Sequence, residues 1–99
     1  MTYELTFAAS VAGQLDFLTA AERRRVLAAI ERRLTRDPLV ETRNRKPLRP
    51  NPLAPWELRV GSLRVFYEVD ALEPNLVNVL TIGNKRGNKL FVSRKEIQT

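Results

Sequence analysis

The segment WELRVGSLRVFYEVD, residues 56–70, constrains the fold of this chain more than any other part of it. It predicts a β-hairpin with the two-residue loop Gly61-Ser62, because glycine at the first loop position suits a type II′ turn, whose twist matches that of paired strands. A two-residue loop sets the register, so that Arg59 lies opposite Arg64 and successive side chains alternate between two faces. The apolar face then consists of Trp56, Leu58, Val60, Leu63, Val65, Tyr67 and Val69.

The opposite face of the hairpin is polar and carries the arginine pair. It consists of Glu57, Arg59, Arg64, Phe66 and Glu68. Like charges directly opposite each other destabilise a strand pair. Two explanations are open: Glu57 and Glu68 neutralise the arginines in a solvated ladder, or the arginines together bind an anion. The function of the chain depends on which explanation holds.

The first third of the chain predicts one strand and two helices. Apolar side chains alternate over residues 2–7, as in a short strand, and residues 8–18 read as a first helix. Thr19 followed by Glu22 forms a capping box, so a second helix starts there and ends near residue 36. Its expected buried stripe, at helical spacing, consists of Val26, Leu27, Ile30 and Leu34.

The remainder of the chain predicts a loop and further strands. Residues 37–55 hold five of the six prolines and read as a loop rather than an element. Residues 75–82 read as a strand buried on both faces, and residues 89–93 are a candidate for a short final strand. We therefore expect one domain over residues 1–99, of α+β class. The expected order is β-α-α-β-β-β(-β), with an antiparallel sheet covered on one face by the two N-terminal helices.

Histidine and cysteine are both absent from the sequence, and this excludes several kinds of chemistry. Without histidine there is no His-ligated metal site, no Ser-His-Asp hydrolysis and no ribonuclease mechanism with paired histidines. Without cysteine there is no disulfide framework and no thiolate metal site. We expect neither a metal nor a cofactor, so acid–base chemistry must come from Lys, Arg, Tyr, Asp or Glu.

The charge balance indicates a negatively charged partner. Seventeen Lys and Arg against eleven Asp and Glu give a net charge of +6, which suggests a polyanion, an acidic protein or both. No run approaches the roughly 20 apolar residues that a membrane span needs. The N-terminal residues do not read as a signal peptide. We therefore expect a cytoplasmic protein without membrane contact.

The basic residues outside the second helix converge on the arginine pair. They include Arg43, Arg45, Lys46 and Arg49 in the proline-rich loop, and Lys85, Arg86 and Lys89 after the long apolar strand. The proline-rich loop ends where the hairpin begins, and the turn after residues 75–82 leaves the strand next to the hairpin. Both groups of basic residues can therefore surround one sheet face. A basic concavity there would hold a phosphodiester backbone. The arginines of the second helix read instead as its solvated face.

Several motifs together resemble the RelE/ParE superfamily of bacterial type II toxins. They are L-x-x-x-P at 34–38, RKPL at 45–48, the segment LRVG-x-x-RV-x-YEV within the hairpin, and IGNK at 82–85. The resemblance covers about residues 2–92. It implies a small α+β toxin that a cognate acidic antitoxin holds inactive. RelE-like members cut mRNA in the ribosomal A site without a metal, whereas ParE-like members inhibit DNA gyrase.

The resemblance also implies roles for individual residues. Arg64 matches the phosphate-contacting arginine of the family, and Lys85 lies where RelE-like enzymes have a second arginine. Phe91 falls where many members place a catalytic tyrosine, and phenylalanine cannot donate a proton. Lys46 lies where another branch has a glutamate general base. The candidate catalytic residues are thus Arg64, Arg59, Lys85, Lys46 and Glu57, and the candidate nucleic-acid contacts are Arg43, Arg45, Arg49, Arg86 and Lys89.

Three functions remain open at this point. The favoured one is a metal-independent, ribosome-associated mRNA endoribonuclease that inhibits translation and is controlled by an acidic antitoxin. The alternatives are a ParE-like gyrase inhibitor, which the missing tyrosine favours, and a catalytically inactive binding module with the toxin fold. Glu57, Glu68 and Lys46 are candidate bases, and for each of them a structural ion-pair role is the favoured alternative.

Overall fold

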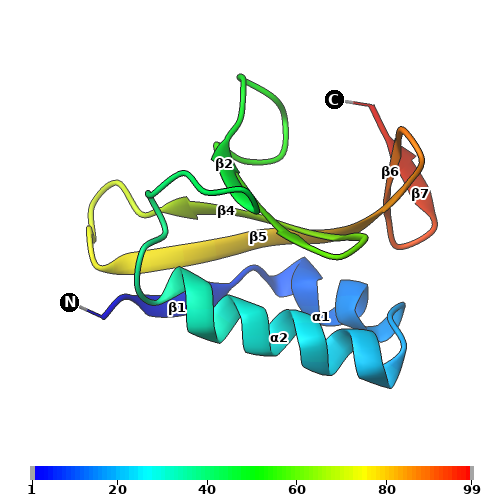
Figure 1. The fold of residues 1–99 in the computed structure, drawn as a ribbon, viewed down its shortest axis with the longest axis horizontal. Coiled ribbons are helices and arrows are strands. Elements are labelled where there is room, and N and C mark those ends of the chain that lie inside the picture. Colours follow the sequence, from blue (N-terminus) through cyan, green and yellow to red (C-terminus); the bar gives the residue numbers. More distant parts are fainter. Residues whose placement is uncertain (1, 99) are drawn as a thin grey trace.

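In the computed structural model, which describes residues 2–98, both helices lie along one face of a seven-stranded sheet (Figure 1). The elements are β1 (Glu4–Phe7), α1 (Ala9–Asp16), α2 (Ala20–Leu34), β2 (Arg45–Pro47), β3 (Trp56–Val60), β4 (Leu63–Val69), β5 (Leu76–Arg86), β6 (Lys89–Val92) and β7 (Lys95–Ile97). The predicted α+β class and the one-sided helical cover are confirmed. Neither helix of this described region has the length and apolar character that a bilayer-crossing helix requires.

The sheet runs β2-β3-β4-β5-β6-β7 with antiparallel neighbours, and β1 joins it differently from the prediction. β1 pairs with β5 in parallel, with Glu4 opposite Leu76 and Phe7 opposite Val79. One edge of β5 pairs with β4, so its other edge is shared by β1 along its first half and β6 near its end. Between these two partners, residues 80–83 of β5 have no strand on that edge.

The predicted hairpin is confirmed in register and in turn type. Val60 lies opposite Leu63 and Arg59 opposite Arg64. Gly61 has a φ of 62°, whereas Ser62 is not among the residues of positive φ, as a type II′ turn requires. The turn therefore depends on glycine, because this φ is costly for residues that carry a Cβ.

The main core lies between the helices and the sheet, and it contains the apolar face of the hairpin. The capping box of Thr19 and Glu22 starts α2 as predicted. The predicted helix stripe is wrong in one member: Leu27 is exposed, and the buried stripe of α2 is Val26, Ile30 and Leu34. These three residues are spaced by four, so they form a narrow line, and Leu27 lies about 100° around the helix from Val26.

A second, smaller core lies on the face of the sheet that the helices leave open. It consists of Ala54, Phe66 and Leu90, with Leu48, Leu53, Leu80 and Ile97 packed against them. This cluster holds the proline-rich segment on the sheet. The prediction that residues 37–55 contain no element is wrong, since β2 lies within them and pairs with β3. Asn51 stabilises the loop between β2 and β3: its side-chain amide donates to the carbonyls of Arg49 and Ala54 at 2.7 and 2.9 Å.

The C-terminal third also differs from the prediction in two ways. β5 is longer than expected, and it is not buried on both faces: Val77 and Val79 are buried, whereas Asn78 and Leu80 are half-buried. The candidate last strand over residues 89–93 exists as β6, and β7 follows it as a further, unexpected strand. The smaller core explains the first difference, because it covers the open face of β5 only in part.

Tyr67 ties the sheet to the segment that follows α2. Its ring is fully buried, and its hydroxyl donates to the carbonyl of Pro38 at 2.6 Å. Burial raises the pKa of the Tyr67 hydroxyl above its ordinary value. The hydroxyl therefore stays protonated and serves as a donor at any physiological pH.

Replacing Tyr67 with phenylalanine tests this tie. The variant leaves the Pro38 carbonyl without its donor, so we expect the free energy of unfolding to fall by about 1–2 kcal/mol. Urea denaturation followed by circular dichroism measures it. The matched control is Tyr3→Phe, at a half-buried ring on the edge of the same core. Equal losses in the two variants would contradict the role of the hydrogen bond.

Candidate functional site

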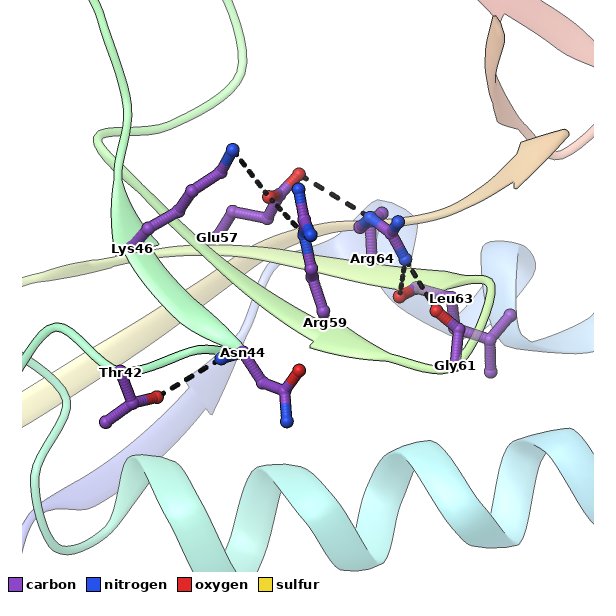
Figure 2. Close-up of polar contacts among 8 residues, drawn as sticks. All are labelled: Thr42, Asn44, Lys46, Glu57, Arg59, Gly61, Leu63 and Arg64. Atoms are coloured by element: carbon purple, nitrogen blue, oxygen red, sulfur yellow. Dashed lines mark hydrogen bonds and ion pairs between the residues drawn. The ribbon is translucent and has the colours of Figure 1, made fainter. Parts of the chain in front are cut away.

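A single carboxylate, that of Glu57, lies among three cationic side chains on the open face of the sheet (Figure 2). Its Oε2 is 3.9 Å from Lys46 Nζ and 3.6 Å from Arg59 Nε. Its Oε1 is 3.8 Å from Arg64 Nε. We call Glu57, Lys46, Arg59 and Arg64 the cation cluster.

Strand register alone brings this cluster together. β2 pairs with β3 so that Lys46 lies opposite Glu57, and the tight turn puts Arg64 opposite Arg59. Glu57 and Arg59 are two positions apart on β3 and so share a face. The backbone N–H of Arg59 also donates to the carbonyl of Asn44 at 2.7 Å, which extends the β2–β3 pairing.

The electrostatic balance of the cation cluster leaves positive charge in excess. Three cations around one carboxylate leave a surplus of two positive charges. The three separations exceed hydrogen-bond length, so none of the contacts is a tight ion pair. The side chains of Lys46 and Arg59 are 42% and 41% exposed, whereas that of Glu57 is 9% exposed. The surplus charge is therefore accessible to a ligand from solvent.

Arg64 is the most constrained cation of the cluster. Its side chain is 11% exposed, and Nη1 donates to the carbonyls of Gly61 and Leu63 at 2.7 and 3.0 Å. Within the described residues its buried Nε finds no hydrogen-bond partner. Burial lowers the pKa of Arg64 from its ordinary value, while the Glu57 carboxylate opposes this shift and the Arg59 charge adds to it. The guanidinium is thus fixed in place with unused donor capacity.

The neutralised-ladder explanation holds only in part. Glu57 does contact both arginines, as that explanation requires. Glu68 does not: its Oε2 accepts a hydrogen bond from Asn78 Nδ2 at 3.0 Å. One carboxylate therefore serves both arginines and a lysine, which is too little negative charge to neutralise them.

A cleft of about 630 Å³ adjoins the cation cluster. β2 and the loop after it form one wall, and the β5–β6 turn with β7 forms the other; both rise from the open face of the sheet (Figure 1). The cleft brings together five of the predicted site residues, namely Lys46, Arg49, Glu57, Lys85 and Lys89. We call it the basic cleft. Arg59 and Arg64 do not line it, but both contact Glu57, which does.

Backbone pairing positions Lys85 at this site. Its N–H donates to the carbonyl of Ser62 at 2.7 Å, so it is attached to the hairpin turn. Gly83 lies opposite Arg64, and Lys85 is two positions further along β5, on the same face as Arg64.

Three predicted nucleic-acid contacts lie elsewhere. Arg45 is buried, and its guanidinium donates to the carbonyls of Val40 and Arg33 at 2.7 and 3.4 Å, so it does not face the basic cleft. The physical reason is that Arg45 pairs with a core residue of β3 and therefore faces the helices. Arg43 is exposed in the turn before β2, outside the basic cleft. Arg86 lies over the ring of Phe91, also outside the cleft.

Phe91 does not face the basic cleft. It lines a different hollow, and its neighbour Leu90 lines the cleft instead. The cleft also contains Glu96, which the sequence interpretation missed. Glu96 belongs to a three-residue strand without apolar alternation, so no sequence signal singled it out. Within residues 2–98 the structure has no group of three or more His, Cys, Asp and Glu side chains that could hold a metal ion.

The charge balance of the cation cluster predicts a salt-dependent effect of Glu57→Gln. Without the carboxylate the three cations repel one another, so we expect the free energy of unfolding to fall by about 1–2 kcal/mol at low salt. The loss should shrink as salt screens the repulsion. Urea denaturation at low and high salt measures it, with Glu68→Gln as the control. A loss that does not depend on salt would show that packing, not charge, is the role of Glu57.

The similar chains found among solved structures include members of two complexes. One is the toxin–antitoxin complex RelBE2 from Mycobacterium tuberculosis, at 23% identity and a TM-score of 0.69, over 86% of this chain and 100% of that one. The other is the archaeal RelE–RelB complex from Pyrococcus horikoshii OT3, at 25% identity and a TM-score of 0.61, over 88% and 98%. Neither protein-family models nor curated proteins give a match. The chain has a RelE-like structure, which confirms the resemblance to the RelE/ParE superfamily.

Proposed function

We propose that this chain is the toxin of a type II toxin–antitoxin module and acts in the cytoplasm as a metal-independent mRNA endoribonuclease on the ribosome. The observation that carries the proposal is the cation cluster: three cations share one carboxylate beside a basic cleft. The RelE-like structure supports the toxin role. One of these structures is a toxin–antitoxin complex and the other a RelE–RelB complex, so we propose an acidic antitoxin as partner of this chain.

The proposed reaction is an internal transesterification of RNA. The 2′-oxygen forms a bond to the adjacent phosphorus, the bond from phosphorus to the 5′-oxygen breaks, and a cyclic phosphate and a free 5′-hydroxyl result. The 2′-hydroxyl loses a proton and the leaving oxygen gains one. The protein therefore has to orient the phosphate, stabilise the added negative charge and handle two protons.

The residues of the site divide these tasks in the proposal. Arg64, whose guanidinium is fixed, stabilises the charge that develops on the phosphoryl oxygens, since a planar fork of donors matches them. Arg59 and Lys85 hold the neighbouring phosphates. Glu57 accepts the 2′-hydroxyl proton, and the ammonium group of Lys46 supplies the proton to the leaving oxygen.

A second candidate function follows from Phe91. Its ring has no proton to donate and does not face the basic cleft, so a tyrosine-like role is vacant. A non-enzymatic gyrase inhibitor would need no such group. A DNA supercoiling assay with purified gyrase separates this candidate from the ribonuclease. A chain that neither cleaves mRNA nor inhibits supercoiling, and whose expression leaves growth unchanged, is the inactive binding module.

Substitution of Arg64 tests the ribonuclease directly. We expect Arg64→Ala to lower the single-turnover rate of mRNA cleavage on ribosomes by about 100-fold or more, because a fixed donor to the developing charge is lost. The cleavage rate of Arg64→Lys should lie between those of the wild type and Arg64→Ala, since lysine keeps the charge and loses the planar fork of donors. Arg32→Ala, on the exposed side of α2, is the matched control. Equal rates for wild type and Arg64→Ala would rule out the proposed role.

A further inference from the structure

The guanidinium of Arg45 is buried on the helix-bearing side of the sheet, and the proposed reaction does not use it. The residue is 6% exposed. Nε donates to the carbonyl of Val40 at 2.7 Å, and Nη1 donates to that of Arg33 at 3.4 Å. Within residues 2–98 no carboxylate forms an ion pair with this side chain. A buried guanidinium without such a partner is uncommon, because removing its charge from water is costly.

Both acceptors of this guanidinium belong to the end of α2 and the turn that follows it. Arg33 lies in the last turn of α2, where backbone carbonyls carry partial negative charge and favour a nearby cation. Val40 lies in the turn after the helix, and the carbonyl of Pro38 in the same turn accepts from the Tyr67 hydroxyl at 2.6 Å. The side chain of Arg45 therefore ties β2 to a turn that a second buried donor already holds in place.

The pairing of β2 with β3 is short, so β2 gains much from this tie. Three residue pairs join the two strands, and one of them contains Pro47, which has no N–H to donate. β2 is also the last strand at its end of the sheet. Short edge segments with few backbone hydrogen bonds open easily. Arg45 adds an attachment on the side of the sheet opposite the basic cleft.

The position of Lys46 depends on that attachment, because Lys46 is the next residue along β2. Side chains alternate along a strand, so the inward turn of Arg45 puts Lys46 on the open face. Its Nζ lies 3.9 Å from Glu57 Oε2, and its side chain is 42% exposed (Figure 2). A long and exposed side chain reaches this position reproducibly only when the backbone that carries it is fixed.

We propose that Arg45 is a positioning residue, which holds β2 against the end of α2 so that the ammonium group of Lys46 stays at the leaving oxygen. This inference rests on the proposed function, in which Lys46 supplies the proton to that oxygen. The role requires no contact between Arg45 and RNA. The cations assigned to the phosphates, Arg59, Arg64 and Lys85, lie on β3, β4 and β5, so RNA binding should persist without it.

Single-turnover cleavage of two RNA substrates on ribosomes tests the inference. One is ordinary RNA, and the other carries sulfur in place of the leaving 5′-oxygen. We expect Arg45→Met to lower the rate on ordinary RNA by about 10- to 100-fold, since a displaced general acid loses much of its effect. On the sulfur substrate its rate should stay within about twofold of the wild type, because a thiolate leaves without protonation. The protein concentration that gives half the maximal rate should not change.

Three further variants separate positioning from general stability. Lys46→Met should show the same dependence on substrate, and adding Arg45→Met to it should cost little more, because both act on one step. Arg45→Lys keeps the charge and a donor, so it should restore part of the rate on ordinary RNA. Tyr67→Phe removes the other buried donor to the same turn and leaves the Arg45 contacts in place. This control should lower stability without distinguishing the two substrates.

The contrary outcomes are equally specific. Equal losses on both substrates in Arg45→Met would show that Arg45 supports the fold alone, and an unchanged rate would show that it supports neither; both overturn the inference. Equal losses on both substrates in Lys46→Met would assign the proton to another group and overturn it as well.

Amide hydrogen exchange tests the attachment of β2 without any cleavage. The N–H of Arg59, which donates to the carbonyl of Asn44, should exchange about tenfold faster in Arg45→Met, while the amides between β4 and β5 keep their protection. Unchanged exchange at Arg59 overturns the inference. A wild-type chain that cleaves neither substrate refutes the ribonuclease, and faster exchange at Arg59 would still support Arg45 as the anchor of β2, so the two proposals fail separately.

Discussion

The opposition of Arg59 and Arg64 across a two-residue turn is the constraint on which the rest of the site depends. Two guanidinium groups on neighbouring strands repel each other, and one buried carboxylate, that of Glu57, offsets part of this repulsion. Because Lys46 also contacts this carboxylate, the positive charge of the cluster is neutralised only in part. A buried carboxylate with excess cations around it is a poor source of stability and a good template for an anion, since the cations are already assembled.

The sheet separates two kinds of packing, and this separation positions the site. One face carries the helices and the main core, while the other carries a smaller core under the segment after β2. That smaller core raises a wall beside the cation cluster, because Leu48 and Ala54 pack near Phe66 on the open face. Without it the cations would lie on an open sheet surface, where salt and water weaken their hold on a phosphate.

Short-range rules predicted part of this arrangement, and pairing between distant segments decided the remainder. The turn at Gly61 and the capping box at Thr19 are local, so their geometry follows from sequence alone. The different orientations of Arg45 and Lys46 do not follow from local sequence, because the RKPL motif does not distinguish the two residues. The pairing of β2 with β3 turns Arg45 toward the helices and Lys46 into the cleft. The family resemblance likewise puts Phe91 at the position of a catalytic tyrosine, whereas the β5–β6 pairing turns it away from the cleft.

The alternation of side chains along β5 and β6 gives the two faces of this part of the sheet different residues. Lys85 faces the basic cleft, whereas its neighbours Asn84 and Arg86 line a second hollow on the helix-bearing side of the sheet. A period of two thus assigns adjacent basic residues to opposite sides of the sheet.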